Sequence, residues 1–189
     1  MTKRISKRKA KQENTNNVKN NLELRQIQPL TPNQKYTFES YDSGANLVLH
    51  GYAGVGKSFL ALYLALNDVL NCRSYDKIVL VRSVVPTRDM GFLPGSIKEK
   101  SRVYEDPYYE IVSDLCARGD AYDILKQKGL IQFTTTSFLR GVTFNDAIVI
   151  FDECQNANFH ELNTVMTRMG NNSKIIFCGD FRQTDLVHD

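Results

Sequence analysis

The stretch with the clearest chemistry runs from Gly51 to Ser58 and reads GYAGVGKS. It fits the pattern G-x-x-x-x-G-K-[ST] in full, which is typical of loops that bind the phosphates of a nucleotide. Glycines let the backbone turn its amide N–H groups inward around an anion, and a following helix presents its positive N-terminal end to that anion. Lys57 can reach the β and γ phosphates, and the hydroxyl of Ser58 can ligate Mg²⁺.

The alternative is that these glycines form an ordinary turn before a core helix. The context argues against a plain turn, because the apolar stretch NLVLHG leads into the motif and the helix-forming stretch KSFLALYLALNDVLN leads out of it. We therefore predict that the loop and the first residues of the helix bind nucleotide and Mg²⁺: Gly51, Tyr52, Ala53, Gly54, Val55, Gly56, Lys57, Ser58 and Phe59. Kinases of small molecules, GTPases and ATPases all use such a loop, so other residues must discriminate among them.

Two adjacent acids, Asp152 and Glu153, follow the apolar run AIVIF. This position is the carboxyl edge of a parallel sheet, where ligands of open α/β sheets bind. In proteins with this phosphate loop an Asp there holds Mg²⁺, which fits Asp152, and the adjacent Glu153 can activate water as a general base. The alternative is that both acids cap the next helix.

A second strand ends in polar residues, because KIIFCGDFRQ places Asp180 and Gln183 after an apolar run. A glutamine there can contact the γ phosphate or position the attacking water. Taken alone, GDFRQ fits an Asp-stabilised turn equally well. Three polar strand ends in one sheet favour a single catalytic edge.

The elements that must position these residues alternate between strands and helices. Apolar strands are expected at 46–51, 77–83, 130–136, 147–151 and 174–180, and helices from Thr31–Pro32, from residue 57, at 108–117, at 120–128 and near 158–169. Strands buried on both faces indicate an α/β fold, which we expect to be a three-layer P-loop NTPase (RecA-like) with a mostly parallel sheet. Residues 84–107 contain three prolines and are expected to form a long irregular loop.

Composition narrows the class of protein. The length of 189 residues suits one compact domain, and no run of about 18 apolar residues could span a membrane. The N-terminus lacks the apolar core of a secretory signal, so we expect a cytoplasmic protein without a membrane partner. The four cysteines and three histidines are scattered, which argues against a zinc site or a disulfide framework.

Residues 1–29 are expected to be a basic, disordered tail ahead of a domain at 30–189. Residues 1–20 hold seven Lys or Arg and one Glu, a net charge of +6, so the rest of the chain carries −3 of the total +3. Such a tail can bind RNA or single-stranded DNA through the phosphates. It can equally be a solvated, solubilising terminus, and the sequence leaves both readings open.

Several motifs, in this order, make the chain resemble the PhoH family, phosphate-starvation-inducible P-loop ATPases related to superfamily 1 helicases. They are NQKYTFES, the phosphate loop, VRSVVPTRDMGFLPGSIKEK, FLRGVTFNDAIVIFDECQN, TRMG and CGDFRQTDL, and the resemblance spans roughly residues 31–187. Cys154 replaces an Ala common in cellular members, a change that the resemblance associates with the bacteriophage branch. Family members usually continue past the last strand with an arginine-bearing segment, which the domain at 30–189 is expected to lack.

The resemblance implies roles for individual residues. Gln34 would read the adenine edge and favour ATP, although it can equally be an exposed helix residue. Lys57 and Ser58 would hold phosphate and Mg²⁺, with Asp152 supporting the metal and Glu153 activating water. Two glutamines, Gln155 and Gln183, would couple the γ phosphate to a nucleic-acid surface.

Three arginines lie in matching motifs: Arg82, Arg140 and Arg168. Each could be a phosphate sensor, a finger that crosses between subunits or an ion-pair partner, and we rank Arg140 and Arg168 first. The leading hypothesis is a Mg²⁺-dependent ATPase coupled to RNA or single-stranded DNA, assembled as a homo-oligomer that could be a hexameric ring. The alternatives are a small-molecule phosphotransferase and a catalytically weak nucleotide-binding assembly module.

Overall fold

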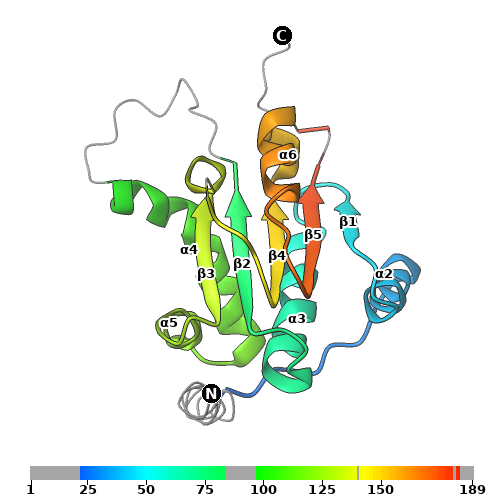
Figure 1. The fold of residues 1–189 in the computed structure, drawn as a ribbon. Helices are drawn as coiled ribbons and strands as arrows, with labels where there is room; N and C mark the ends of the chain where they lie inside the picture. Colours follow the sequence, from blue (N-terminus) through cyan, green and yellow to red (C-terminus); the bar gives the residue numbers. More distant parts are fainter. Residues whose placement is uncertain (1–21, 84–96, 140, 181, 184–189) are drawn as a thin grey trace, which may run out of the picture.

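The computed structural model describes residues 22–83, 97–139, 141–180 and 182–183 (Figure 1). Its centre is a five-stranded sheet of order β1-β5-β4-β2-β3, and every neighbouring pair of strands is parallel. This confirms the predicted α/β fold and its parallel sheet. The strands are β1 (Leu47–His50), β2 (Lys77–Arg82), β3 (Ile131–Thr135), β4 (Ala147–Asp152) and β5 (Ser173–Gly179).

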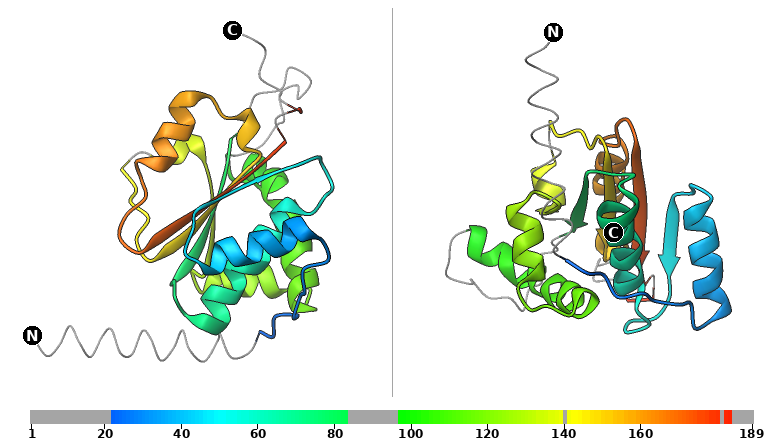
Figure 2. Two further views of the ribbon diagram at one scale, coloured as in Figure 1. Left: turned by 90° about the vertical axis from the view of Figure 1, so that its right-hand side faces the viewer. Right: turned by 90° about the horizontal axis from the view of Figure 1, so that it is seen from below.

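Helices cover both faces of the sheet, which gives three layers (Figure 2). On one face lie α3 (Lys57–Asn67), α4 (Ile97–Cys116) and α5 (Ala121–Gln127), and on the other lies α6 (Phe159–Met166). The helix α2 (Pro32–Asp42) lies beyond β1 at the edge of the sheet. Short helical turns at Asp68–Cys72, Thr136–Phe138 and Cys154–Asn156 complete the described elements.

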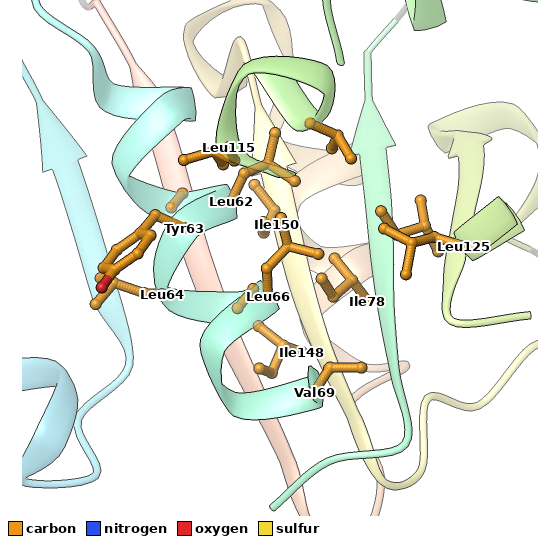
Figure 3. Close-up of a cluster of buried hydrophobic side chains, with 14 of the residues drawn as sticks. Leu62, Tyr63, Leu64, Leu66, Val69, Ile78, Leu115, Leu125, Ile148 and Ile150 are labelled. Atoms are coloured by element: carbon orange, nitrogen blue, oxygen red, sulfur yellow. The ribbon is translucent and has the colours of Figure 1, made fainter. Parts of the chain in front are cut away.

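The alternation of side chains along each strand divides the core between the two faces. In β4, Ile148 and Ile150 belong to the cluster under α3, α4 and α5, whereas Val149 and Phe151 belong to the cluster under α6. Because all six residues of β4 are buried, this strand has no solvated face. Figure 3 shows part of the first cluster, in which Leu62 and Leu66 of α3 lie beside Ile148 and Ile150 of β4.

The helix α3 is enclosed on every side, because the six consecutive residues from Ala61 to Leu66 are all buried. Its sequence of Leu and Ala combines high helix propensity with a fully apolar surface, which suits a helix placed between the sheet and other helices. The phosphate loop is therefore attached to a helix that is buried in the core.

Residues 22–29 differ from the tail expected for residues 1–29. Leu22 and Leu24 are buried in the core under α3. The backbone N–H of Arg25 donates to the carbonyl of Leu115, and that of Ile27 donates to the hydroxyl of Tyr63. The alternating apolar residues of this extended segment bury one side of it. The pattern is short and follows a polar stretch, so the sequence did not predict it. The remaining tail residues lie outside the described part of the chain.

The loop expected at 84–107 is also shorter than predicted, because α4 begins at Ile97 and runs through Pro107. A proline inside a helix removes one hydrogen bond and bends the helix, but it does not forbid one. Packing on both sides of Pro107 offsets this loss. Glu105 is buried and accepts hydrogen bonds from Tyr122 and Lys126 of α5, and Tyr108 is buried against the sheet.

Three polar residues meet near the amino-terminal ends of the strands, and we call Tyr41, Asp68 and Lys174 the amino-edge cluster. Tyr41 and Lys174 are buried, and Asp68 is partly exposed. The ammonium group of Lys174 donates to the carbonyl of Tyr41 at 2.8 Å and lies 3.7 Å from the centre of the Tyr41 ring. The Tyr41 hydroxyl donates to Asp68 at 2.7 Å. Burial lowers the pKa of Lys174, and nearby Asp68 and Asp42 partly oppose that shift. The cluster ties α2 to the sheet.

Candidate nucleotide-binding site

The phosphate loop occupies residues 51–56, between the end of β1 and the start of α3. Gly54 and Gly56 have φ angles of +77° and +85°, in the left-handed region that favours glycine. Gly56 also caps α3 and, having no side chain, makes no side-chain cap hydrogen bond to the first amide groups of that helix. The amide groups of the first turn are thus left for an anion, which fits a phosphate.

The side chains of the loop divide into an inner and an outer set. Lys57 crosses the loop, and its Nζ donates to the carbonyls of Gly51 and Tyr52, both at 2.8 Å. By contrast, the side chains of Tyr52 and Val55 are exposed. Phe59 packs against the core under α3 and anchors the first turn of the helix.

Asp152 lies at the end of β4 and faces the start of α3. Its Oδ1 accepts a hydrogen bond from Ser58 at 2.8 Å, and its Oδ2 accepts one from the hydroxyl of Tyr108 at 2.9 Å. Burial raises the pKa of Asp152, while the hydrogen bonds from Ser58 and Tyr108 and the charge of Arg82 partly oppose this shift. A buried carboxylate beside a hydroxyl is a donor pair that suits Mg²⁺.

Among the described residues, no group of three or more His, Cys, Asp or Glu could hold a metal ion. Mg²⁺ does not require such a group, because it is usually bound by one or two protein ligands together with water and substrate phosphate. Ser58 and Asp152 therefore fit the ion without a cage of protein ligands.

Arg82 ends β2 and is the register partner of Asp152 in β4. Its guanidinium donates to the carbonyl of Tyr104 at 3.3 Å and lies 5.6 Å from the centre of that ring. From the sequence, Arg82 ranked after Arg140 and Arg168 as a candidate phosphate sensor. In the structure, Arg82 lies at the carboxyl edge of the sheet.

Glu153 adopts a left-handed conformation with φ of +52°, which is uncommon for a residue with a side chain. Its Oε2 accepts a hydrogen bond from Nε2 of Gln155 at 2.6 Å. The amide oxygen of the same glutamine accepts from the backbone N–H of Asp180 at 3.1 Å. Gln155 thus bridges the residue after β4 to the residue after β5.

Asp180 extends this connection to the phosphate loop, because its Oδ2 accepts from the backbone N–H of Ala53 at 3.1 Å. The loops after β1, β4 and β5 therefore form one hydrogen-bonded edge. Gly179 makes the approach between two of them possible, since a Cβ there would lie 2.7 Å from the sulfur of Cys154 and 3.0 Å from Oε1 of Gln155.

Other predicted site residues lie elsewhere or are bonded differently. Gln183 lies in a turn after Asp180, and its side chain is exposed. The side-chain oxygen of Gln34 accepts from the N–H of Leu30 at 2.7 Å, so this residue helps to close the start of α2. Arg140 lies outside the described residues.

Arg168 follows α6, and its carbonyl accepts from the N–H of Phe144 in the segment that leads into the amino end of β4. Its Nε is buried and has no hydrogen-bond partner among the described residues. Arg168 thus lies near the amino ends of the strands, and not at the hydrogen-bonded edge that contains the phosphate loop.

Two neighbours of the site were missed from the sequence. Tyr108 is the first residue of the helix expected at 108–117 and belongs to no motif, so nothing in the sequence indicated that it faces Asp152. Arg182 lies 4.9 Å from the centre of the Tyr52 ring and donates to its hydroxyl. The only sequence signal for Arg182 was its position in the GDFRQ motif.

Comparison with known proteins is consistent with this geometry. A family model described as "PhoH-like protein" matches residues 26–189. The chain belongs to this family. It is 34% identical over 161 residues to a PhoH-like protein of Mycobacterium leprae, covering 85% of this chain and 46% of that protein. It is 32% identical to protein PhoH of Escherichia coli, covering 81% of this chain and 44% of that protein.

The chain spans about half the length of these curated relatives, and the matched regions cover 46% and 44% of them. Among solved structures, the fold is similar to a Sulfolobus solfataricus SWI2/SNF2 ATPase core in complex with double-stranded DNA. The TM-score is 0.52 at 15% identity, and the match covers 82% of this chain and 34% of that chain. This similarity supports the RecA-like fold. None of the described helices is long and apolar enough to cross a membrane.

Proposed function

We propose that this PhoH-family chain binds ATP with Mg²⁺ and hydrolyses it to ADP and phosphate. The observation that carries the proposal is the shared edge on which Ser58 meets Asp152 while Gln155 joins Glu153 to the loop after β5. A phosphate loop alone would support binding. The acids and the glutamine beside it supply the groups that hydrolysis needs.

The chain would hold the phosphates with the amide groups of residues 51–59 and with Lys57. Ser58 and Asp152 would hold Mg²⁺, which when bound neutralises charge on the phosphate oxygens. The left-handed backbone of Glu153 turns its carboxylate out of the line of the strand, and Gln155 fixes one of its oxygens. The other oxygen, Oε1, would take the proton of the attacking water.

Further roles are assigned on the family resemblance. Gln34 would select adenine, Gln183 would sense the γ phosphate, and Arg140 or Arg168 would stabilise charge in the transition state. The position of Arg168 favours a contact outside its own phosphate loop, such as one to a neighbouring subunit.

Mass measurement of the native protein tests the proposed homo-oligomer, including a hexameric ring. The cytoplasmic location and the bacteriophage origin, which rests on Cys154, stay predictions.

The decisive experiment compares phosphate release by the wild type with that by Glu153→Gln. Loss of the general base should lower turnover by about 10²–10⁴-fold, while ATP binding remains. Glu39→Gln, an exposed change of the same kind on α2, should leave turnover unchanged. No hydrolysis by the wild type, or equal rates in the wild type and Glu153→Gln, would refute the ATPase.

We also propose that turnover is coupled to RNA or single-stranded DNA. The support is the net charge of +6 in residues 1–20 and the helicase-like resemblance. Deleting residues 2–20 should abolish salt-sensitive RNA binding, because it removes the cations that neutralise phosphates. Unchanged affinity after the deletion would contradict a nucleic-acid role for the tail, and RNA that leaves turnover unchanged would contradict the coupling.

Product analysis separates the remaining alternatives. A phosphorylated acceptor instead of free phosphate would indicate a small-molecule phosphotransferase. Tight ATP binding without phosphate release would indicate a nucleotide-binding assembly module, an alternative kept because the match covers less than half of its curated relatives.

A further inference from the structure

The helix α4 contacts the carboxyl edge of the sheet through two tyrosines one turn apart. Residues four positions apart lie on the same face of a helix, which places Tyr104 and Tyr108 side by side. The carbonyl of Tyr104 accepts a hydrogen bond from Arg82, and the hydroxyl of Tyr108 donates one to Asp152. Since Arg82 and Asp152 are register partners in β2 and β4, one face of α4 holds two adjacent strand ends.

The contact between Tyr108 and Asp152 is closed to solvent. Tyr108 is 1% exposed and Asp152 is 7% exposed, so little water can replace the hydroxyl as a donor. A tyrosine hydroxyl carries its proton at neutral pH, so Tyr108 is a hydrogen-bond donor to the carboxylate there.

The two oxygens of Asp152 have separate partners. Oδ1 accepts from the hydroxyl of Ser58 and from the backbone N–H of Glu153, at 2.8 and 3.1 Å, whereas Oδ2 accepts from Tyr108. The tyrosine therefore fixes the rotation of the carboxylate. With Oδ2 held by α4, Oδ1 remains turned toward the phosphate loop.

We propose that Tyr108 is a positioning residue for the Mg²⁺ site, which it serves by holding Asp152 with one oxygen directed at Ser58. The inference rests on the proposed function, because it assigns Mg²⁺ to Ser58 and Asp152. Hydrogen-bonding partners of metal ligands commonly contribute ten- to a hundred-fold to metal affinity. Tyr108 thus sets how much Mg²⁺ the site needs through its hydrogen bond to Asp152.

The test compares Tyr108→Phe with Tyr109→Phe. Both changes remove one hydroxyl from the same helix, but the hydroxyl of Tyr109 donates to Asp123 of α5 and not to the site. The primary measurement is the Mg²⁺ concentration at which binding of a fluorescent ADP analogue is half complete. Analogue binding in EDTA, thermal unfolding, and turnover at saturating Mg²⁺ are measured alongside.

For Tyr108→Phe, we expect the half-saturating Mg²⁺ concentration to rise about tenfold, with binding in EDTA unchanged. Tyr109→Phe should match the wild type in both measurements. If Tyr108→Phe unfolds early, all three proteins are titrated at a temperature where their circular dichroism spectra agree.

An unchanged Mg²⁺ requirement in Tyr108→Phe would overturn the positioning role, even if turnover or stability falls. The same holds if Tyr109→Phe shifts the requirement equally. If the wild type shows no Mg²⁺-dependent nucleotide binding, the proposed function fails and the role of Tyr108 fails with it. Mg²⁺-dependent binding by the wild type together with an unchanged Tyr108→Phe would overturn the inference about Tyr108 alone.

Discussion

The two ends of the parallel sheet both bury polar groups, but these groups have different kinds of hydrogen-bonding partner. In the amino-edge cluster, the ammonium of Lys174 lies over the ring of Tyr41 and donates to the carbonyl of that residue. The hydroxyl of Tyr41 donates in turn to the carboxylate of Asp68. At the carboxyl edge, the buried Asp152 is held by two neutral hydroxyl donors, while the side-chain amide of Gln155 holds the carboxylate of Glu153.

This difference separates a structural polar cluster from a binding site. A cluster whose polar groups bond to one another ties elements together and gains nothing from a ligand. Carboxylates held mainly by neutral donors retain the capacity to bind a cation, at a cost in the free energy of folding. Substitutions at the amino edge should therefore change stability alone, whereas substitutions at the carboxyl edge should change activity as well.

The largest effect is expected from Gly179→Ala, which breaks the close approach at the carboxyl edge. The added Cβ would lie 2.7 Å from the sulfur of Cys154 and displace Gln155, so we expect a loss of about 3 kcal/mol in the free energy of unfolding. Turnover should fall as well, because Gln155 holds Glu153. Denaturant unfolding and phosphate release are the measurements.

Gly119→Ala is the matched control, because a Cβ at Gly119 would meet nothing within 4 Å. Adding Cys154→Ala to Gly179→Ala removes the clashing sulfur and should recover part of the lost stability. No recovery in the double variant would contradict the proposed contact.

A smaller effect is expected from Tyr41→Phe, which opens the amino-edge cluster. Removing the hydroxyl that donates to Asp68 should cost about 1.5 kcal/mol in the free energy of unfolding, as for other hydrogen bonds to charged groups. ATP turnover and its Mg²⁺ requirement should not change. Tyr36→Phe, an exposed change on the same helix, serves as the control, and a changed Mg²⁺ requirement in Tyr41→Phe would erase the distinction between the two edges.

The smallest expected effect is a gain in the free energy of unfolding instead of a loss. Because burial raises the pKa of Asp152, its charge at neutral pH opposes folding when no metal is bound. Asp152→Asn should therefore raise the free energy of unfolding by about 1 kcal/mol in EDTA at pH 7. The gain should shrink as the pH falls, because the wild-type carboxyl then takes up a proton in the folded state.

Thermal unfolding of both proteins in EDTA, from pH 7 downward, measures this difference. Asp106→Asn, an exposed change on α4, should leave stability unaltered. In the presence of Mg²⁺ and ADP, the wild type should gain stability that Asp152→Asn lacks. A less stable Asp152→Asn in EDTA would show that its hydrogen bonds outweigh the burial of the charge.

The fold was largely predictable, because each strand is an apolar run between polar boundaries and the phosphate loop lies in an unbroken motif. Asp152 and Glu153 could be assigned to one edge because parallel strands share a direction. The contacts of Gln155 and Tyr108 could not be predicted, since they join segments from different strands and helices. Pro107 misled the prediction because proline is usually read as a helix boundary, and Leu22 and Leu24 were hidden because two apolar residues make too short a pattern.

The pairing of β1 also bears on the order of folding during synthesis. In the described sheet β1 pairs with β5 alone, so the strand before the phosphate loop must wait for a partner that ends at Gly179. At typical rates of translation, the wait from His50 to Gly179 is on the order of ten seconds. By the end of that interval β2, β3 and β4 have been synthesised, so we expect the edge that carries the phosphate loop to form after the rest of the sheet.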